Sequence, residues 1–177
     1  MSESILILNT TEVQRALTRI AYEIAERDNS GEGLVIVGVQ RGGVHLAKRL
    51  GDQISKILGQ PVLVGTLDVG MHRDDLHHHA APQIQPTELP FNVTGKTVVL
   101  VDDVLFSGRT TRAALDALND FGRPKRVQLA VLIDRGHREL PIKADFVGKN
   151  VPTSLKERIY VCLREEGGED RVTLEKL

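Results

Sequence analysis

Residues 98–110 constrain the fold of this chain more than any other stretch. They begin with four apolar, mostly β-branched residues, 98–101, which predict a short buried strand. Asp102 and Asp103 follow it at the carboxyl edge, where open α/β sheets place their ligands. The chain then turns at Gly108 into a helical pattern. This order of elements predicts an α/β fold with a ligand site at the edge of the sheet.

The loop after the acidic pair has the composition of an anion site. Gly108 allows a tight turn, the hydroxyls of Ser107 and Thr110 can donate, and the helix predicted over 112–121 offers its N-terminus to a phosphate. The two carboxylates would instead bind hydroxyl groups or a metal. A ribose 5-phosphate carries both hydroxyls and a phosphate, so it fits both the acidic pair and the loop. The alternative is an ordinary strand, turn and helix in which the acidic pair only caps.

A second strand, glycine loop and helix precede this motif. Residues 34–39 read as a buried parallel strand, and a helix is predicted over 44–58. Between them lie Gln40, Arg41, Gly42 and Gly43, which can present backbone N–H groups and one charge to an anion. The Arg-Gly-Gly sequence alone is a weak signal. It gains weight because it lies one strand and one helix before the acidic motif.

The rest of the chain supplies further elements of the same fold class. A first helix is predicted to run to about Arg27, with Thr10 and Thr11 as candidate N-caps. Gly122 is predicted as the C-cap glycine of the helix at 112–121. Strands are predicted over 61–69 and 127–133, and closing antiparallel strands over 159–163 and 172–174. We therefore expect residues 1–177 to form one domain with a mobile loop at about 70–95.

Composition excludes several functional classes. The chain has 177 residues, a net charge of −1 and a pI of about 6.6, so global basicity does not indicate nucleic-acid binding. The single Cys162 excludes an intrachain disulfide framework, and no apolar run is long enough for a membrane span. We expect a soluble cytoplasmic protein without membrane contacts.

Residues 98–110 resemble the 5-phosphoribosyl 1-pyrophosphate (PRPP) signature of type I phosphoribosyltransferases. In that family the acidic pair holds the ribose hydroxyls, the following loop holds the 5-phosphate, and a loop like 40–43 meets the pyrophosphate. The resemblance implies nucleotide binding by Gln40, Arg41, Gly42, Val98, Val99, Leu100, Val101, Asp102, Asp103, Val104, Leu105, Phe106, Ser107, Gly108, Arg109 and Thr110.

Two further segments, 134–141 and 147–154, resemble one subfamily: the bifunctional pyrimidine-operon regulators that also act as uracil phosphoribosyltransferases. The likeness extends from about Ile5 to Ser154. It implies a mostly parallel twisted sheet flanked by helices, a small hood, and a homodimer or larger assembly. The implied reaction converts uracil and PRPP to UMP and pyrophosphate, with Asp102, Asp103 and Arg73 as catalytic residues. The implied cofactor is Mg²⁺, held indirectly by Asp102 and Asp103 through ribose hydroxyls or water.

The chain departs from the subfamily pattern at several positions. Phe106 and Ser107 replace the usual Tyr-Thr pair, His72 replaces a Tyr in the mobile loop, and Tyr22 replaces a His in the first helix. Asp74 and Asp75 are candidates for binding metal-bound water or for simple loop solvation. Residues 77–79 are three consecutive histidines, which lack the spacing of a zinc site and read as polar loop residues.

The subfamily resemblance also implies UMP- or UTP-dependent binding to pyrimidine-operon leader mRNA. A local excess of positive charge lies between Arg123 and Lys143, and the first helix adds two arginines. The implied RNA-binding residues are Arg15, Thr18, Arg19, Tyr22, Arg135, Arg138 and Lys149. The alternative is two unconnected solvated faces. Two other functions also stay open: a regulatory RNA-binding nucleotide sensor with vestigial catalysis, and a transferase for a purine or orotate. An apolar residue at Phe106, where purine transferases hold a carboxylate, favours a pyrimidine.

Overall fold

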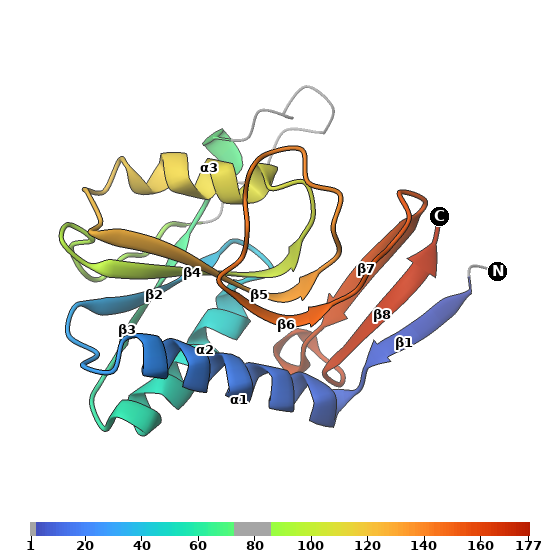
Figure 1. Cartoon of the computed structure of the whole chain (residues 1–177), viewed down its shortest axis with the longest axis horizontal. Helices are drawn as coiled ribbons and strands as arrows, with labels where there is room; N and C mark the ends of the chain where they lie inside the picture. The colour runs from blue at the N-terminus through green and yellow to red at the C-terminus, as the bar shows by residue number, and fades with distance from the viewer. Residues whose placement is uncertain (1–2, 73–85) are drawn as a thin grey trace.

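A five-stranded parallel sheet lies at the centre of the computed structural model, which describes residues 3–72 and 86–177 (Figure 1). The strand order is β3-β2-β4-β5-β6, which places β2 and β4 in the interior. The strands are β2 (Leu34–Val39), β3 (Leu63–Leu67), β4 (Thr97–Leu105), β5 (Arg126–Asp134) and β6 (Phe146–Asn150). The predicted α/β fold class is confirmed.

Three helices cover the two faces of this sheet. Helices α1 (Thr10–Arg27) and α2 (Val44–Leu58) pack on one face, and α3 (Arg109–Leu118) packs on the other (Figure 1). Separate clusters of buried apolar side chains fill the space on each side of the sheet. Residues 98–101 of β4 are at most 1% exposed, so this part of the strand is buried on both faces of the sheet.

A second, antiparallel sheet forms the predicted hood. Its strands are β1 (Ser4–Leu8), β7 (Glu157–Cys162) and β8 (Arg171–Lys176), in the order β1-β8-β7. Figure 1 shows this sheet beside the main one, with both chain ends at its outer tips. The closing pair of strands was predicted. Strand β1 was not, because no element was assigned to the residues before the first helix.

Helix ends differ from the prediction in two places. The N-cap of α1 is Asn9, not Thr10 or Thr11: its side chain accepts from the Glu12 N–H at 2.9 Å, and the Glu12 carboxylate accepts from the Asn9 N–H at 2.8 Å. Helix α3 begins three residues before the predicted start and ends at Leu118. Its predicted end, Phe121, is 44% exposed beyond the helix, and Asn119 replaces the predicted C-cap Gly122.

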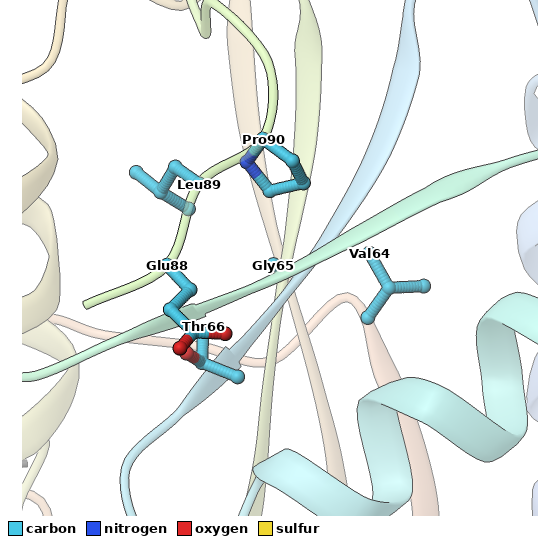
Figure 2. A pocket seen from close by; sticks show the side chains of 6 residues that line it. All are labelled: Val64, Gly65, Thr66, Glu88, Leu89 and Pro90. Atoms are coloured by element: carbon cyan, nitrogen blue, oxygen red, sulfur yellow. The ribbon is translucent and has the colours of Figure 1, made fainter. Parts of the chain in front are cut away.

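The outer edge of β3 is partly covered by the returning chain. Thr66 and Glu88 exchange backbone hydrogen bonds of 2.8 and 2.9 Å, and Figure 2 shows the two residues lying together on a hollow of about 350 Å³. A Cβ on Gly65 would lie 2.7 Å from the Glu88 carbonyl oxygen, so a glycine is needed for this close approach. The cover limits edge-to-edge pairing. Among the described helices, none is long and apolar enough to cross a membrane.

Candidate active site

The strand order places the topological switch point, and with it the crevice expected for a ligand, between β2 and β4. The chain leaves β2 toward β3 on one side and leaves β4 toward β5 on the other, so the loops after these neighbouring strands diverge. Ligands of open α/β sheets bind at such a switch point, outside the carboxyl ends of the strands. The two glycine loops singled out in the sequence, 40–43 and 106–108, both lie there.

The loop after β2 packs directly against β4. A Cβ on Gly43 would lie 1.8 Å from the Val101 carbonyl oxygen, and one on Gly42 would lie 2.4 Å from the Asp103 carboxylate. Real Cβ atoms do not approach that closely, so position 43 requires glycine, and a side chain at position 42 would displace the Asp103 carboxylate. The Gln40–Arg41 peptide bond is cis, and the Arg41 side chain is exposed. The predicted pyrophosphate loop and the acidic pair are thus in contact.

The acidic pair lies inside β4, not after it, because the strand continues to Leu105. Successive residues of a strand point to opposite faces, so the two carboxylates diverge. Asp102 lines a pocket on the α3 side, whereas Asp103 faces Gly42 on the other side. Each accepts a backbone N–H from the next residue, at 2.9 Å for Asp102 and 2.7 Å for Asp103.

The pocket beside Asp102 has a volume of about 100 Å³ and lies where the phosphate cradle is expected. Gly108 has a φ of 93°, which a glycine adopts readily, and it immediately precedes the first turn of α3. The walls are Asp102, Val104, Leu105, Phe106, Ser107, Gly108, Thr110, Thr111 and Val131. Residues 98–101, also predicted to bind nucleotide, are core side chains that support this wall without lining it. Arg109 instead lies 3.2 Å from the Glu139 carboxylate.

The sequence analysis missed the contribution of residues 138–140, which lie along the outer side of the loop 106–108 and hold it in place. The Arg138 guanidinium donates to the Phe106 carbonyl at 2.7 Å, and the Glu139 N–H donates to the Ser107 carbonyl at 2.9 Å. In a trans peptide the C=O and the following N–H point in opposite directions. The N–H groups of Ser107 and Gly108 therefore point away from these residues. Residues 138–140 satisfy the loop carbonyls, which leaves N–H groups to face an anion.

Arg135 does not lie on an exposed face as its RNA-binding role requires. Its side chain is 8% exposed, and its guanidinium donates to Thr153 and to the carbonyls of Ser154 and Glu157. The predicted basic stretch is also divided. Arg126 begins β5 and Arg135 follows its last residue, so nine residue steps of about 3.3 Å separate them by roughly 30 Å.

The polar face of α1 is exposed as predicted. Arg15, Thr18, Arg19 and Tyr22 line one hollow of about 410 Å³ together with Thr11 and Gln14. Tyr22 is 58% exposed. Arg19 donates to the Val147 carbonyl at 2.9 Å and also to the Gly148 carbonyl. This contact joins α1 to β6, the strand that carries the exposed Lys149.

Several predicted residues lie outside the described part of the chain: Arg73, Asp74, Asp75 and the histidines 77–79. The neighbouring His72 is described, and its Nε2 lies 3.2 Å from the Asp120 carboxylate. Within the residues that the structure describes, no group of three or more His, Cys, Asp and Glu side chains is placed to hold a metal ion. A metal at the acidic pair would need ligands from the substrate.

Comparisons with known proteins agree with this geometry. The family model for the phosphoribosyl transferase domain matches residues 6–158. A protein named bifunctional protein PyrR from Chloroflexus aurantiacus is 59% identical over 95% of this chain and 93% of its own length. One from Geobacter sulfurreducens is 54% identical over 99% of this chain and 100% of its own.

The fold also matches a solved structure. A hypoxanthine-guanine phosphoribosyltransferase from Bacillus anthracis superposes with a TM-score of 0.73 at 20% identity, covering 96% of each chain. At this identity the likeness concerns the fold alone. The sequence relatives are much closer and extend over nearly the whole chain. This protein therefore belongs to the phosphoribosyl transferase family and, within it, to the bifunctional PyrR proteins.

Proposed function

We propose that this protein transfers the phosphoribosyl group of PRPP to uracil, giving UMP and pyrophosphate, and that it regulates pyrimidine-operon expression by nucleotide-dependent binding to leader mRNA. The observation that carries the enzymatic part is the crevice between β2 and β4. At the carboxyl ends of these two strands, a phosphate-sized pocket, an acidic pair and a glycine loop lie close together. Membership of the bifunctional PyrR proteins supports both parts.

Different residues bind different parts of the substrate. The 5-phosphate lies in the pocket at the start of α3, where hydroxyls and N–H groups converge. Asp102, at the mouth of that pocket, accepts hydrogen bonds from a ribose hydroxyl. Asp103 lies against the loop that carries Arg41, so it faces the pyrophosphate side of the sugar. Arg73 is proposed to reach the leaving group from outside the described residues.

Mg²⁺ fits this donor set as a substrate-borne ion. Two carboxylates that point to opposite faces of a strand do not enclose a cation, but Mg²⁺ commonly binds through one or two carboxylates, waters and substrate phosphates. Asp103 and Asp102 would hold such an ion indirectly, through water or ribose hydroxyls. Held there, Mg²⁺ would supply positive charge that offsets the negative charge of the pyrophosphate leaving group.

The chain itself contributes position and charge. Uracil N1 displaces pyrophosphate at the anomeric carbon through an oxocarbenium-like transition state, which nearby carboxylates stabilise electrostatically. The fixed loops hold sugar and base in line for this displacement. Phe106, 37% exposed beyond the acidic pair, presents an apolar ring where the base is expected and so favours a pyrimidine.

The deciding experiment incubates the purified protein with PRPP and Mg²⁺ and with uracil, orotate, hypoxanthine or guanine separately. Nucleotide is measured by chromatography and pyrophosphate by a coupled assay. UMP formed from uracil alone is the expected result. Product from a purine or orotate would assign another transferase. No product with any base, combined with leader-RNA binding that responds to UMP, would assign a regulator with vestigial catalysis.

The RNA surface is proposed on α1. Its hollow presents Arg15 and Arg19 for phosphates and Tyr22 for stacking on an unpaired base. A neighbouring hollow shares Gln14 and Thr18 with it and adds the exposed Lys56 and Arg164. These charges replace Arg135, which is buried, and Lys149 remains beside them on β6. Assembly as a homodimer or larger oligomer is part of the same proposal.

A further inference from the structure

Arg135 links the end of the main sheet to the hood. Its Nε donates to the Thr153 hydroxyl at 3.0 Å, and its Nη2 donates to the carbonyls of Ser154 and Glu157 at 3.0 and 2.8 Å. Thr153 and Ser154 precede the hood, and Glu157 begins β7. One side chain from the end of β5 therefore fixes the path by which the chain enters the hood.

The same guanidinium lies over the ring of Phe106. Its Cζ is 4.2 Å from the ring centroid, which is cation–π distance. His137 meets the same ring edge-on, with centroids 5.8 Å apart and an interplanar angle of 66°. The Arg135 N–H also donates to the Leu105 carbonyl at 3.0 Å, next to Phe106 in the chain. Phe106 is thus held by the group that holds the hood entry.

Only arginine can do both at once. A guanidinium donates in its plane and stacks through its face, whereas a lysine ammonium is a point donor without a face. Burial lowers the pKa of Arg135 from its usual value, yet an arginine stays protonated near neutral pH. Its hydrogen-bond acceptors are a hydroxyl and two carbonyls, all uncharged. The nearby charge of Glu157 offsets part of the cost of burying this cation, but the three acceptors themselves are neutral, so the guanidinium is a costly way to join two segments.

We infer that Arg135 is a positioning residue for the nucleobase, which acts by holding the Phe106 ring and the hood entry in one fixed arrangement. The inference rests on the proposed function, in which the base lies against Phe106. Phe106 also lines the phosphate pocket, but the backbone of that pocket's loop is held separately, by α3 and by the Arg138 and Glu139 hydrogen bonds. Loosening Arg135 should therefore weaken binding of the base and leave binding of the phosphate unchanged.

Two ligands separate these contributions. UMP and ribose 5-phosphate share the sugar phosphate and differ by the base, so the ratio of their affinities measures base binding alone. Calorimetry on the full chain gives both affinities for wild type, Arg135→Lys and Arg135→Ala. We expect Arg135→Lys to weaken UMP binding at least about tenfold and ribose 5-phosphate binding by less than about twofold, because only the stack and the forked hydrogen bonds are lost. In the transferase assay KM for uracil should rise and KM for PRPP should not.

Arg158→Lys is the matched control. Arg158 belongs to β7 of the hood and also lies near an aromatic ring, with its Cζ 6.0 Å from the centroid of Tyr160, but it is exposed. This variant should bind both ligands as wild type does. If Arg135→Ala does not fold, as judged by circular dichroism, Arg135→Lys carries the test.

Equal weakening of UMP and ribose 5-phosphate would overturn the inference and assign Arg135 a structural role. It would also be overturned by unchanged UMP binding in Arg135→Lys, or by a wild type that binds UMP no more tightly than ribose 5-phosphate. A wild type that makes no UMP from uracil would contradict the proposed function instead. The affinity ratio would still decide the role of Arg135, because it needs no turnover.

Discussion

The guanidinium of Arg49 on α2 holds the carboxylate of Asp170, just before β8, through two hydrogen bonds of 2.8 Å each. Its remaining donors meet Glu165 at 2.6 and 2.7 Å. The side chains of Asp170 and Arg49 are 1% and 10% exposed. A buried, doubly hydrogen-bonded ion pair thus joins the helical layer of the main sheet to the hood.

This pair predicts a loss of stability in acid. The hydrogen bonds from Arg49 lower the pKa of Asp170 and of Glu165 from their usual values. A carboxyl whose pKa is lower in the folded state stabilises the protein above its unfolded pKa of about 4, and this contribution is lost as the pH falls through the folded pKa. Asp170→Ala should lower the free energy of unfolding by roughly 3 kcal/mol at pH 7, because it leaves the buried Arg49 with Glu165 as its remaining charged partner. Urea unfolding followed by circular dichroism measures it.

The control is the exposed pair between Lys176 and Glu3, 3.4 Å apart on the same hood. Lys176→Ala should change stability little, because exposed pairs contribute little. Asp170→Asn should also show a flatter decline of stability between neutral pH and pH 3 than wild type. A parallel decline in the two proteins would contradict the role of Asp170.

The acidic pair predicts a loss of transferase activity. Asp102→Asn and Asp103→Asn each remove a charge from the site and should lower kcat/KM at least about 10²-fold. Asp116→Asn, on the exposed face of α3, serves as the matched control and should act as wild type does. Near-normal turnover in both site variants would show that the pair has another role.

Substitution of Gly42 should impair PRPP binding, whereas substitution of Gly59 should impair only stability. In Gly42→Ala the new Cβ would meet the Asp103 carboxylate, so the carboxylate must move and PRPP binding should weaken. Gly59→Ala is the reverse case, since its Cβ has open space but its φ of 68° is unfavourable for alanine. It should cost about 1 kcal/mol of stability and no activity. Wild-type PRPP affinity in Gly42→Ala, measured by calorimetry, would contradict the contact between loop and carboxylate.

Substitution of the arginines proposed to bind pyrophosphate should change the affinity for PRPP but not for UMP. Arg41→Ala and Arg73→Ala should weaken binding of PRPP and leave binding of UMP unchanged, because UMP has no pyrophosphate. Arginines of this kind meet phosphate oxygens with two parallel hydrogen bonds. Calorimetry with both ligands measures the effect. Equal affinities for PRPP in wild type and both variants would show that these arginines are solvated surface residues that do not bind pyrophosphate.

The α1 hollow predicts RNA binding that depends on charge and on UMP. Binding of a pyrimidine-operon leader hairpin should tighten with UMP and weaken steeply with salt, as phosphate contacts release counterions. Arg15→Glu should weaken it at least about tenfold and leave transferase activity intact, since Arg15 is exposed and outside the crevice. Arg15 is a better site for charge reversal than Arg138, which holds the Phe106 carbonyl.

Tyr22→His, which restores the residue usual in the subfamily, is the conservative control and should retain binding. A filter assay at low salt measures all these affinities. If wild type binds no leader RNA with or without UMP, the enzymatic function stands alone.

The sequence by itself determined the fold class and most of the order of elements, and it predicted where a site should lie. A short, β-branched apolar run such as 98–101 is typical of a buried interior strand, and a glycine turn into a helix is a local feature that needs no tertiary context. For that reason the fold class, the helix at 44–58 and the closing antiparallel strands were predicted correctly. Helix ends were less certain because caps depend on single side chains, as with Asn9 in place of Thr10.

Only the tertiary structure decided how distant segments share the site. The divergence of Asp102 and Asp103 follows from β4 continuing past them, and the fit of Gly42 against Asp103 follows from β2 and β4 being neighbours. The sequence assigned Arg135 to an RNA surface because charge alone suggests exposure. The fold buries it instead, because carbonyls from the hood entry and the Phe106 ring, far apart in the chain, converge to receive its planar guanidinium.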